Sequence, residues 1–198
     1  MESLKNAPLI TVFTATYNRG HLIQRIYQSL LRQKEFNFEW LVIDDGSQDQ
    51  TEDLFNDWTS RDNPFEIRYY KQENRGLIRT LNRGIELARG EYFAKIDSDD
   101  YVVDDYATNI SKWVASIENS TSIYAVSGVR VTPDGIPLKG KWPDIPRELG
   151  FVDATDLERA AYDLDADMCE AWRTDVLRNY PFPVWNSEKF APEQIVFN

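Results

Sequence analysis

The sequence predicts an α/β fold in which helices cover both faces of a mostly parallel central sheet, with a Rossmann-like arrangement in its first half. Three observations predict it. Over the first hundred residues, short apolar runs take turns with segments of helical period. Within each run the residues are apolar in succession, without polar residues at every second position, and several runs end in polar clusters. Continuous apolar strands are typical of parallel sheets that are buried on both faces.

The first half of the chain alternates regularly between expected strands and helices. Helical spacing is recognised by apolar side chains that recur three and four residues apart, and Gly90 is expected to end the last of these helices. The expected elements are, in order, a strand at 9–15, a helix over 22–30, a strand at 40–43, a helix around 54–58, a strand at 67–69, a helix over 77–88 and a strand at 92–96.

The pattern is looser after residue 100. A helix over 110–117 precedes a strand around 123–131, and the residues 133–135 form a turn signal. The stretch 137–150 is rich in proline and glycine and is expected to be a surface loop. A short helix is expected to begin at Thr155, capped by its hydroxyl with Glu158 three residues on, and another at Thr174.

Composition narrows the class of protein. The chain has 198 residues and a formal net charge of −11, so its surface repels the phosphate backbone of nucleic acids, and nucleic-acid binding is not expected. Cys169 is the single cysteine and is expected to be a small buried residue. The sequence contains neither a signal-peptide pattern nor an apolar run of about 18 residues, and a cytoplasmic protein is therefore expected.

Polar side chains follow three of the expected strands. The clusters span Thr14 to Arg19, Asp44 to Ser47, and Asp97 to Asp100. Ligands of open α/β sheets bind at the carboxyl ends of the strands, so the three clusters are expected to meet at one edge. Alternate residues such as Asp97 and Asp99 can turn two carboxylates towards one point, which suits Mg²⁺ or Mn²⁺.

A simpler explanation exists for each cluster taken alone. An acidic tetrad can cap the next helix, and Asp45-Gly46-Ser47 can be an ordinary turn. Asp44 can instead accept the N–H groups of a base such as uracil or guanine. These local explanations have to apply three times, once for each polar cluster on successive strands of one sheet. The occurrence of all three clusters together therefore favours a ligand site.

Four segments of the chain resemble the successive motifs of family 2 inverting glycosyltransferases, which have the A-type glycosyltransferase fold. They are TATYNR, EWLVIDDGSQDQT, ENRGLIRTLNRGIELARGEYFAKIDSDD and FAPEQ. The third segment is the most specific, because the order and spacing of several of its residues are those of the family: Asn74, Gly76, Asn82, Gly84, Ala88, Gly90 and Asp97 to Asp100.

The resemblance implies a role for each matching residue. Thr14, Thr16 and Arg19 would border the nucleotide, and Asp44 would contact the base. Asp97 would contact the ribose or a metal-bound water, and Asp99 would bind the divalent ion, Mn²⁺ or Mg²⁺, that bridges the diphosphate. The full set implied for the nucleotide sugar is Thr14, Thr16, Arg19, Asp44, Asn74, Gly76, Asn82, Asp97 and Ser98, with Asp97 and Asp99 as metal ligands.

The resemblance also implies a catalytic base late in the chain. Glu193 matches the family's position for the carboxylate that deprotonates the acceptor hydroxyl. Gln194 replaces the acidic second member of the usual pair, and Glu193 could alternatively be a first-turn glutamate favoured by the helix dipole. Asp167 and Trp172 are the candidate acceptor contacts; Asp167 is also explained by a structural role.

The implied activity is an inverting transfer of a sugar from a nucleotide-diphosphate donor, most simply UDP-linked, to a hydroxyl of a glycan, lipid-linked or polymer acceptor. Residues 1–104 would form the donor half and 105–198 an acceptor half that is truncated at its end, so that a missing segment could associate with the inner face of the membrane. A sugar nucleotidyltransferase would need a glycine-rich basic loop, for which Asn18-Arg19-Gly20 is too sparse. A catalytically silent nucleotide-sugar-binding module stays open because of Gln194.

Overall fold

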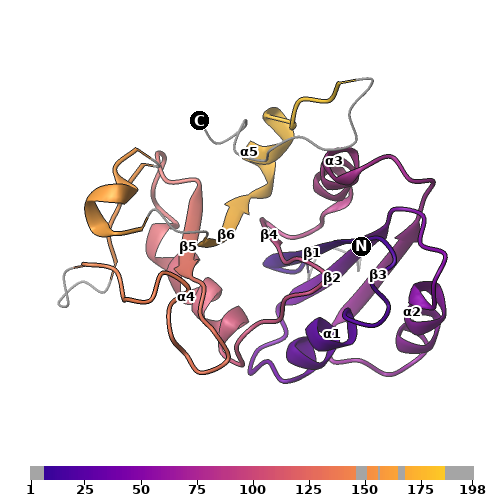
Figure 1. Ribbon diagram of the computed structural model, residues 1–198. Helices are drawn as coiled ribbons and strands as arrows, with labels where there is room; N and C mark the ends of the chain where they lie inside the picture. The colour runs from indigo at the N-terminus through magenta and orange to yellow at the C-terminus, as the bar shows by residue number, and fades with distance from the viewer. Residues whose placement is uncertain (1–6, 146–150, 156, 165–167, 186–198) are drawn as a thin grey trace.

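The computed structural model describes residues 7–145, 151–155, 157–164 and 168–185. Helices and strands alternate along the first half, as expected (Figure 1). The strands are β1 (Ile10–Thr16), β2 (Phe38–Asp44), β3 (Glu66–Lys71), β4 (Tyr92–Lys95), β5 (Ala125–Val129) and β6 (Met168–Arg173). The helices are α1 (Gln24–Leu31), α2 (Thr51–Thr59), α3 (Leu77–Leu87), α4 (Tyr106–Ile117), α5 (Thr174–Asn179) and the short 3-10 helix η1 (Arg159–Tyr162).

The strands form one six-stranded sheet in the order β3-β2-β1-β4-β6-β5. β3, β2, β1 and β4 are parallel neighbours, which confirms the mostly parallel sheet. β6 lies antiparallel between β4 and β5. This strand was not predicted from the sequence, because Ala171 is its only fully buried residue and no apolar run marks it.

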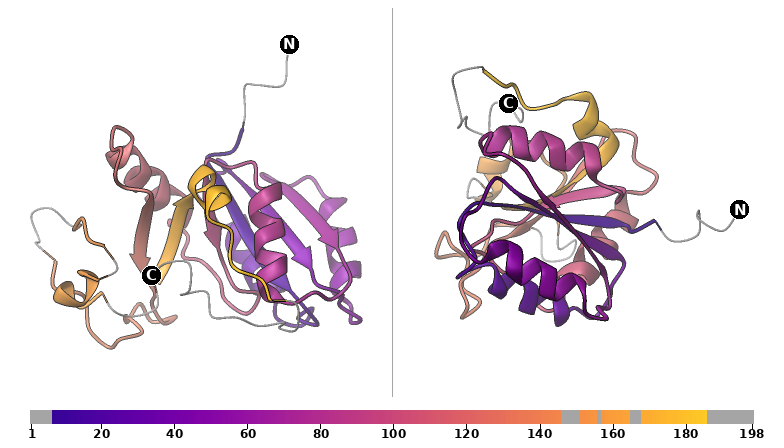
Figure 2. Two further views of the ribbon diagram at one scale, coloured as in Figure 1. Left: turned by 90° about the horizontal axis from the view of Figure 1, so that it is seen from above. Right: turned by 90° about the vertical axis from the view of Figure 1, so that its right-hand side faces the viewer.

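Alternate residues of the central strands supply two hydrophobic cores, one on each face of the sheet. Ile10 and Val12 of β1 pack with apolar residues of α1, α2 and α4, whereas Phe13 packs with residues of α3 and α5. Figure 2 shows the sheet between these two layers of helices. Because side chains alternate across a strand and both faces are covered, β1 and β2 have to be apolar at nearly every position.

Two glycines allow close packing around β1. A Cβ atom on Gly90 would lie 2.2 Å from the backbone nitrogen of Thr11, and one on Gly84 would lie 2.3 Å from the Phe13 ring. The Gly90 N–H donates a 2.8 Å hydrogen bond to the Thr11 hydroxyl. These contacts hold α3 and the start of β4 against β1, which brings the far ends of β1 and β4 together.

The second half agrees with the prediction only in part. α5 begins at Thr174 as expected. At Thr155 the hydroxyl and the backbone N–H both donate 2.9 Å hydrogen bonds to Glu158 Oε2. The bond from the Thr155 N–H to Glu158 is the glutamate half of a capping box, whereas the Thr155 hydroxyl accepts no N–H among the described residues, and the helix that follows is the single 3-10 turn η1. Among the described helices, none is long and apolar enough to cross a lipid bilayer.

Candidate functional site

The loops after β1, β2 and β4 lie side by side at one edge of the sheet. β1 is flanked by β2 and β4, and all three strands run in the same direction. Thr16 pairs in register with Asp44, and Phe13 pairs with Lys95. The prediction that the three polar clusters share one edge is confirmed by this register.

Direct contacts join the three clusters. The backbone N–H of Asn18 donates to Ser47 Oγ at 2.8 Å, and the N–H of Gln48 donates back to Asn18 Oδ1 at 2.8 Å. Asn18 has a φ of 53°, in the left-handed region that asparagine tolerates better than most residues. Arg19 Nη1 lies 3.4 Å from Asp99 Oδ2. The loop after β1 therefore contacts both of its neighbours.

Asp44 is fully enclosed at the end of β2. Its Oδ1 accepts the Ser47 N–H at 2.7 Å, and its Oδ2 accepts the Tyr69 hydroxyl at 2.6 Å. Burial and this hydrogen bond raise the pKa of Tyr69 well above its usual value. In this conformation Asp44 holds the turn that follows β2, as the simpler interpretation expected. The contact with a nucleotide base stays a prediction.

Asp45 organises the opposite side of the same turn. Its Oδ1 accepts hydrogen bonds from the Arg75 N–H at 2.9 Å and from Gln72 Nε2 at 2.7 Å, and its Oδ2 accepts the Gly76 N–H at 2.8 Å. From the sequence Asp45 was expected to be an ordinary turn residue, and this role was not predicted. Two successive acids at a strand end carry the signal, because consecutive side chains leave a strand on opposite faces.

The predicted donor residues Asn74 and Gly76 lie against this turn. Gly76 has a φ of 89° and precedes the first turn of α3. Gly46 has a φ of 90°, and a Cβ atom on it would lie 3.0 Å from the backbone nitrogen of Asn74. Both glycines thus adopt backbone conformations that residues with side chains rarely adopt. The segment 74–76 is thereby placed beside the ends of β1 and β2.

The two threonines of β1 differ in what their hydroxyls contact. Thr14 is fully buried, and its hydroxyl accepts a 3.2 Å hydrogen bond from Trp40 Nε1. Thr16, at the end of the strand, is only 3% exposed, yet its Oγ1 has no hydrogen-bond partner in the described part of the chain. Since buried polar groups almost always have a partner, the unpartnered Thr16 hydroxyl is the stronger candidate for a ligand contact, and the role implied for Thr14 stays a prediction.

The acidic tetrad after β4 is open to solvent. The side chains of Asp97 and Asp99 are 45% and 50% exposed, and each carboxylate lies beside a cation. Lys95 Nζ is 2.8 Å from Asp97 Oδ1, and Asp99 pairs with Arg19. Ser98 between them is buried.

The tetrad is also a candidate metal site. Among the described residues, no group of three or more His, Cys, Asp or Glu side chains could hold a metal ion. Mg²⁺ and Mn²⁺ are commonly held by one or two carboxylates together with substrate phosphates. Asp97 and Asp99 fit that mode of binding, in which the substrate completes the ligand set.

The remaining predicted residues lie away from this edge or outside the described chain. Asn82 Nδ2 donates to the Phe182 carbonyl at 2.9 Å, and the Phe182 N–H donates to Asn82 Oδ1 at 2.9 Å, so both ends of the amide hold the segment after α5 on α3. Trp172 on β6 donates to Glu170 Oε2 at 3.0 Å and packs against the core that contains Phe13 and residues of α3 and α5. Asp167 and Glu193 fall outside the described residues.

Comparison with known proteins matches most of the chain. Residues 11–158 match the model of the family described as glycosyl transferase family 2. Over 99 residues the chain is 39% identical to the putative glycosyltransferase EpsH of Bacillus subtilis (strain 168). This match covers 50% of this chain and 28% of that protein.

Two solved structures share the fold. TarS 1-349 of S. aureus in complex with UDP-GlcNAc superposes with a TM-score of 0.63 at 21% identity, covering 88% of this chain and 48% of that one. The mannosyltransferase PcManGT of Pyrobaculum calidifontis, in complex with GDP-Man and Mn²⁺, superposes with a TM-score of 0.56 at 27% identity. The superposition covers 63% of this chain and 36% of that one. This chain thus spans about half or less of the length of these three proteins.

Proposed function

Since the chain belongs to glycosyl transferase family 2, whose model matches residues 11–158, we propose that it carries the donor-binding and catalytic part of an inverting glycosyltransferase. The observation that carries this proposal is the meeting of three polar clusters at one sheet edge. Asn18 bonds to Ser47, and Arg19 pairs with Asp99, so the ends of β1, β2 and β4 form one continuous surface.

The proposed donor is a nucleotide-diphosphate sugar, with UDP as the nucleotide. The unpartnered hydroxyl of Thr16 at the end of β1 supplies a hydrogen-bonding group, and the cation of Arg19 in the loop that follows supplies a positive charge. An acidic protein needs such local cations to accept a diphosphate. The UDP-GlcNAc complex of TarS and the GDP-Man complex of PcManGT support this donor class.

A divalent ion, Mn²⁺ or Mg²⁺, is proposed to be held by Asp99 with Asp97. When bound, such an ion neutralises charge that develops on the leaving nucleoside diphosphate, as a Lewis acid. The Mn²⁺ complex of PcManGT supports the choice of metal. Arg19 and Lys95 are the chain's own cations beside these carboxylates, and they would add positive charge where the diphosphate arrives.

Glu193 is proposed as the base. It would take the proton from the acceptor hydroxyl while that oxygen bonds to the anomeric carbon and the bond from this carbon to the diphosphate oxygen breaks. Residues 1–104 would hold the donor, and residues 105–198, with Asp167 and Trp172, would contact a glycan, lipid-linked or polymer acceptor. A catalytically silent donor-binding module is the second candidate, favoured by Gln194 in place of an acid.

Thermal unfolding tests the donor site directly. UDP with Mn²⁺ is expected to raise the melting temperature, because a ligand that binds only the folded state stabilises it. The Asp99→Asn variant is expected to lose the Mn²⁺-dependent part of the rise. The Glu86→Gln variant, which removes one exposed charge from α3, is the matched control and is expected to respond like the parent.

The outcomes separate the candidates. If no nucleoside diphosphate shifts the melting temperature, with or without Mn²⁺, the donor site is wrong. If Glu193→Gln keeps the shift and loses donor turnover, the chain is an enzyme with Glu193 in the role proposed. If the parent binds donor and the full-length protein turns over none, the silent module is the correct function.

A further inference from the structure

The carboxyl end of β5 lies at the same edge of the sheet as the proposed donor site. β4 and β5 both pair antiparallel with β6, so they run in the same direction, and Ala94 and Val126 lie opposite the same residue, Ala171. Arg130 directly follows β5, and the acidic tetrad Asp97 to Asp100 follows β4. The second half of the chain therefore brings a cation to the edge where the three polar clusters meet.

Arg130 forms an ion pair with the last acid of the tetrad. Its Nη2 donates to Asp100 Oδ2. The two side chains are 26% and 38% exposed, so solvent screens this pair less than the pair of Arg19 with Asp99, whose side chains are 46% and 50% exposed. Arg130 and Asp100 are 30 residues apart in the chain and belong to the proposed acceptor half and donor half, respectively. The pair thus joins the two halves beside the proposed metal site.

The backbone around Arg130 is hydrogen-bonded on both sides of this residue. Before it, Val129 pairs with Met168 in the ladder between β5 and β6. After it, the chain turns back on itself, and the Arg130 carbonyl accepts the Leu138 N–H at 3.0 Å. The guanidinium therefore reaches the tetrad from a backbone that the sheet holds in place.

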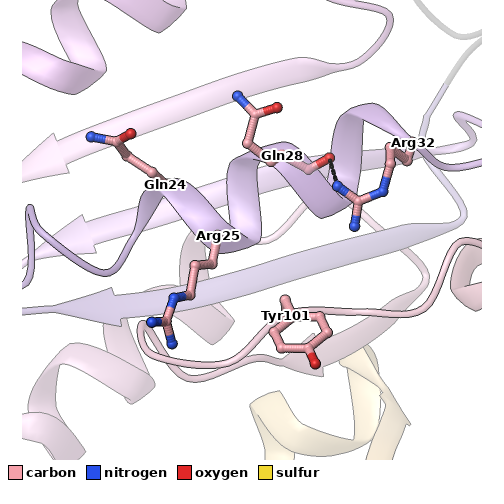
Figure 3. A pocket seen from close by; sticks show the side chains of 5 residues that line it. All are labelled: Gln24, Arg25, Gln28, Arg32 and Tyr101. Carbon is pink, nitrogen blue, oxygen red and sulfur yellow. Dashed lines mark hydrogen bonds between the residues drawn. The ribbon is translucent and has the colours of Figure 1, made fainter. Parts of the chain in front are cut away.

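The tetrad is anchored at both of its ends. Before it, the Ile96 N–H donates to the Phe13 carbonyl at 2.9 Å, and after it the Val102 N–H donates to Ser29 Oγ at 3.2 Å. Figure 3 shows Tyr101, which follows the tetrad directly, beside α1, where it lines an open pocket with Gln24, Arg25, Gln28 and Arg32. The acids themselves lie on the exposed turn between these two anchors.

Ion pairs hold the carboxylates of this turn. Asp97 pairs with Lys95, and Asp99 pairs with Arg19. Asp97 and Asp99 are the proposed metal ligands, so a divalent ion would take the place of these two cations beside them. Asp100 is not a proposed ligand, and its pair with the cation that follows β5 is compatible with an occupied metal site.

We propose that Arg130 is a positioning residue of the metal and donor site, which acts through Asp100 to fix the turn that carries Asp97 and Asp99. The Asp100 N–H donates a 3.0 Å hydrogen bond to the Asp97 carbonyl, so the side chain that Arg130 holds belongs to the residue that closes the turn. This inference rests on the proposed metal-assisted donor binding. It assigns to the second half of the chain a part in donor binding.

Titration calorimetry of UDP over a series of Mn²⁺ concentrations tests the positioning role. It gives the affinity for UDP and the Mn²⁺ concentration at which the effect of the metal is half complete. Arg130→Gln is expected to raise this Mn²⁺ concentration about tenfold, because residues that orient metal ligands commonly change metal affinity by that much or more. Arg130→Lys keeps a cation beside Asp100 and is expected to restore most of the loss.

Arg173→Gln is the matched control. Arg173 also belongs to the second half and pairs with Asp175 at 2.8 Å, but it lies opposite Tyr92 at the start of β4, at the other edge of the sheet. The control is expected to need no more Mn²⁺ than the parent. If Arg130→Gln lowers the melting temperature and leaves the Mn²⁺ requirement unchanged, the pair is merely structural and the positioning role is overturned.

Asp100→Asn breaks the same pair from its other side. It is expected to raise the Mn²⁺ requirement as Arg130→Gln does, and the variant with both changes is expected to be no worse than the weaker of the two. Asp100→Asn also keeps the test open if Arg130→Gln does not fold. If Arg130→Gln weakens UDP binding further in the Asp100→Asn background, or equally without Mn²⁺, Arg130 touches the nucleotide itself and the positioning role is overturned.

The positioning role and the proposed function fail in different ways. If UDP binds the parent with Mn²⁺ and Arg130→Gln needs no more Mn²⁺ than the parent, only the positioning role fails. If UDP binds and Mn²⁺ has no effect, the metal site and the positioning role fail while the donor site stands. If neither UDP nor GDP binds the parent at any Mn²⁺ concentration, the proposed function fails and the positioning role fails with it.

Discussion

The carboxylate of Asp45 accepts a 2.8 Å hydrogen bond from the backbone N–H of Gly76, and this contact joins the end of β2 to the start of α3. The same carboxylate bonds the N–H of Arg75. Two loops that are far apart in the chain are thereby held against each other at the edge where the donor is proposed to bind. The shape of that edge depends on an acid whose side chain is almost completely buried.

Asp45→Asn is expected to lower the free energy of unfolding by about 1–3 kcal/mol, because the new NH2 group faces the backbone N–H of either Gly76 or Arg75, which then loses its acceptor. Urea denaturation measures the change. Glu86→Gln serves as the control for the charge that is removed. An Asp45→Asn variant as stable as the control would show that the bonds to residues 75 and 76 are not important for the fold.

Thr16→Val and Thr14→Val form a matched pair on one strand. Thr16→Val is expected to leave stability unchanged, since its hydroxyl has no partner in the described chain, and to weaken UDP binding about tenfold if that hydroxyl contacts the nucleotide. Thr14→Val removes the acceptor of Trp40 Nε1 and is expected to cost about 1 kcal/mol with UDP binding unchanged. Urea denaturation and calorimetry measure stability and UDP affinity for both variants. A Thr14→Val variant that loses UDP affinity beside a Thr16→Val variant that keeps it would contradict the prediction.

Glu39→Ala is expected to destabilise the protein by about 3–5 kcal/mol, because it leaves the largely buried cation of Arg68 without its counter-charge. The Glu39 carboxylate also accepts the Thr11 hydroxyl at 2.7 Å and the Arg89 N–H at 2.7 Å. Glu66→Ala, which breaks the exposed pair with Arg89, is expected to cost less than about 1 kcal/mol. Similar midpoints for the two variants in urea would contradict this difference.

Gly90→Ala is expected to cost about 3 kcal/mol or more, because the added methyl group meets the backbone of β1 rather than a side chain that can move. Gly135→Ala is the comparison. Gly135 has a φ of 76° and nothing within 4 Å of its added Cβ, so only the backbone strain remains, at about 1–2 kcal/mol. Thermal unfolding ranks the two, and a smaller loss for Gly90→Ala would refute the close packing.

Burial raises the pKa of the Cys169 thiol to about 11. The native thiol is therefore protonated at pH 8, and its alkylation by iodoacetamide is expected to be slow and to accelerate as the pH rises towards 11. In urea the same thiol is expected to react rapidly with its ordinary pKa. Because the chain has one cysteine, mass spectrometry reads a single site, and equal native and unfolded rates at pH 8 would show that the thiol is accessible.

Local patterns were sufficient for the parallel part of the sheet and insufficient for β6. The runs of β1 and β2 are apolar at nearly every position because both faces are covered, and this leaves a trace in the sequence. β6 joins the sheet through antiparallel pairing with β4 and β5, and its mostly half-buried residues leave no such run. At Thr155 the expected pairing with Glu158 is formed, but the hydroxyl donates to the glutamate, and the direction of a hydroxyl's hydrogen bond is not a property of residue type.

The sequence by itself determined the succession of the first four strands along the chain, the helices between them and the three polar clusters at the strand ends. Burial on both faces and polarity at a strand end are local properties. Only the tertiary structure decided how Asp44 and Asp45 differ in their partners, which of the two β1 threonines has an unpartnered hydroxyl, and that Arg25 and Tyr101 share a pocket. Each depends on contacts between segments at least 25 residues apart, and contacts of that range leave no periodic signal in the chain.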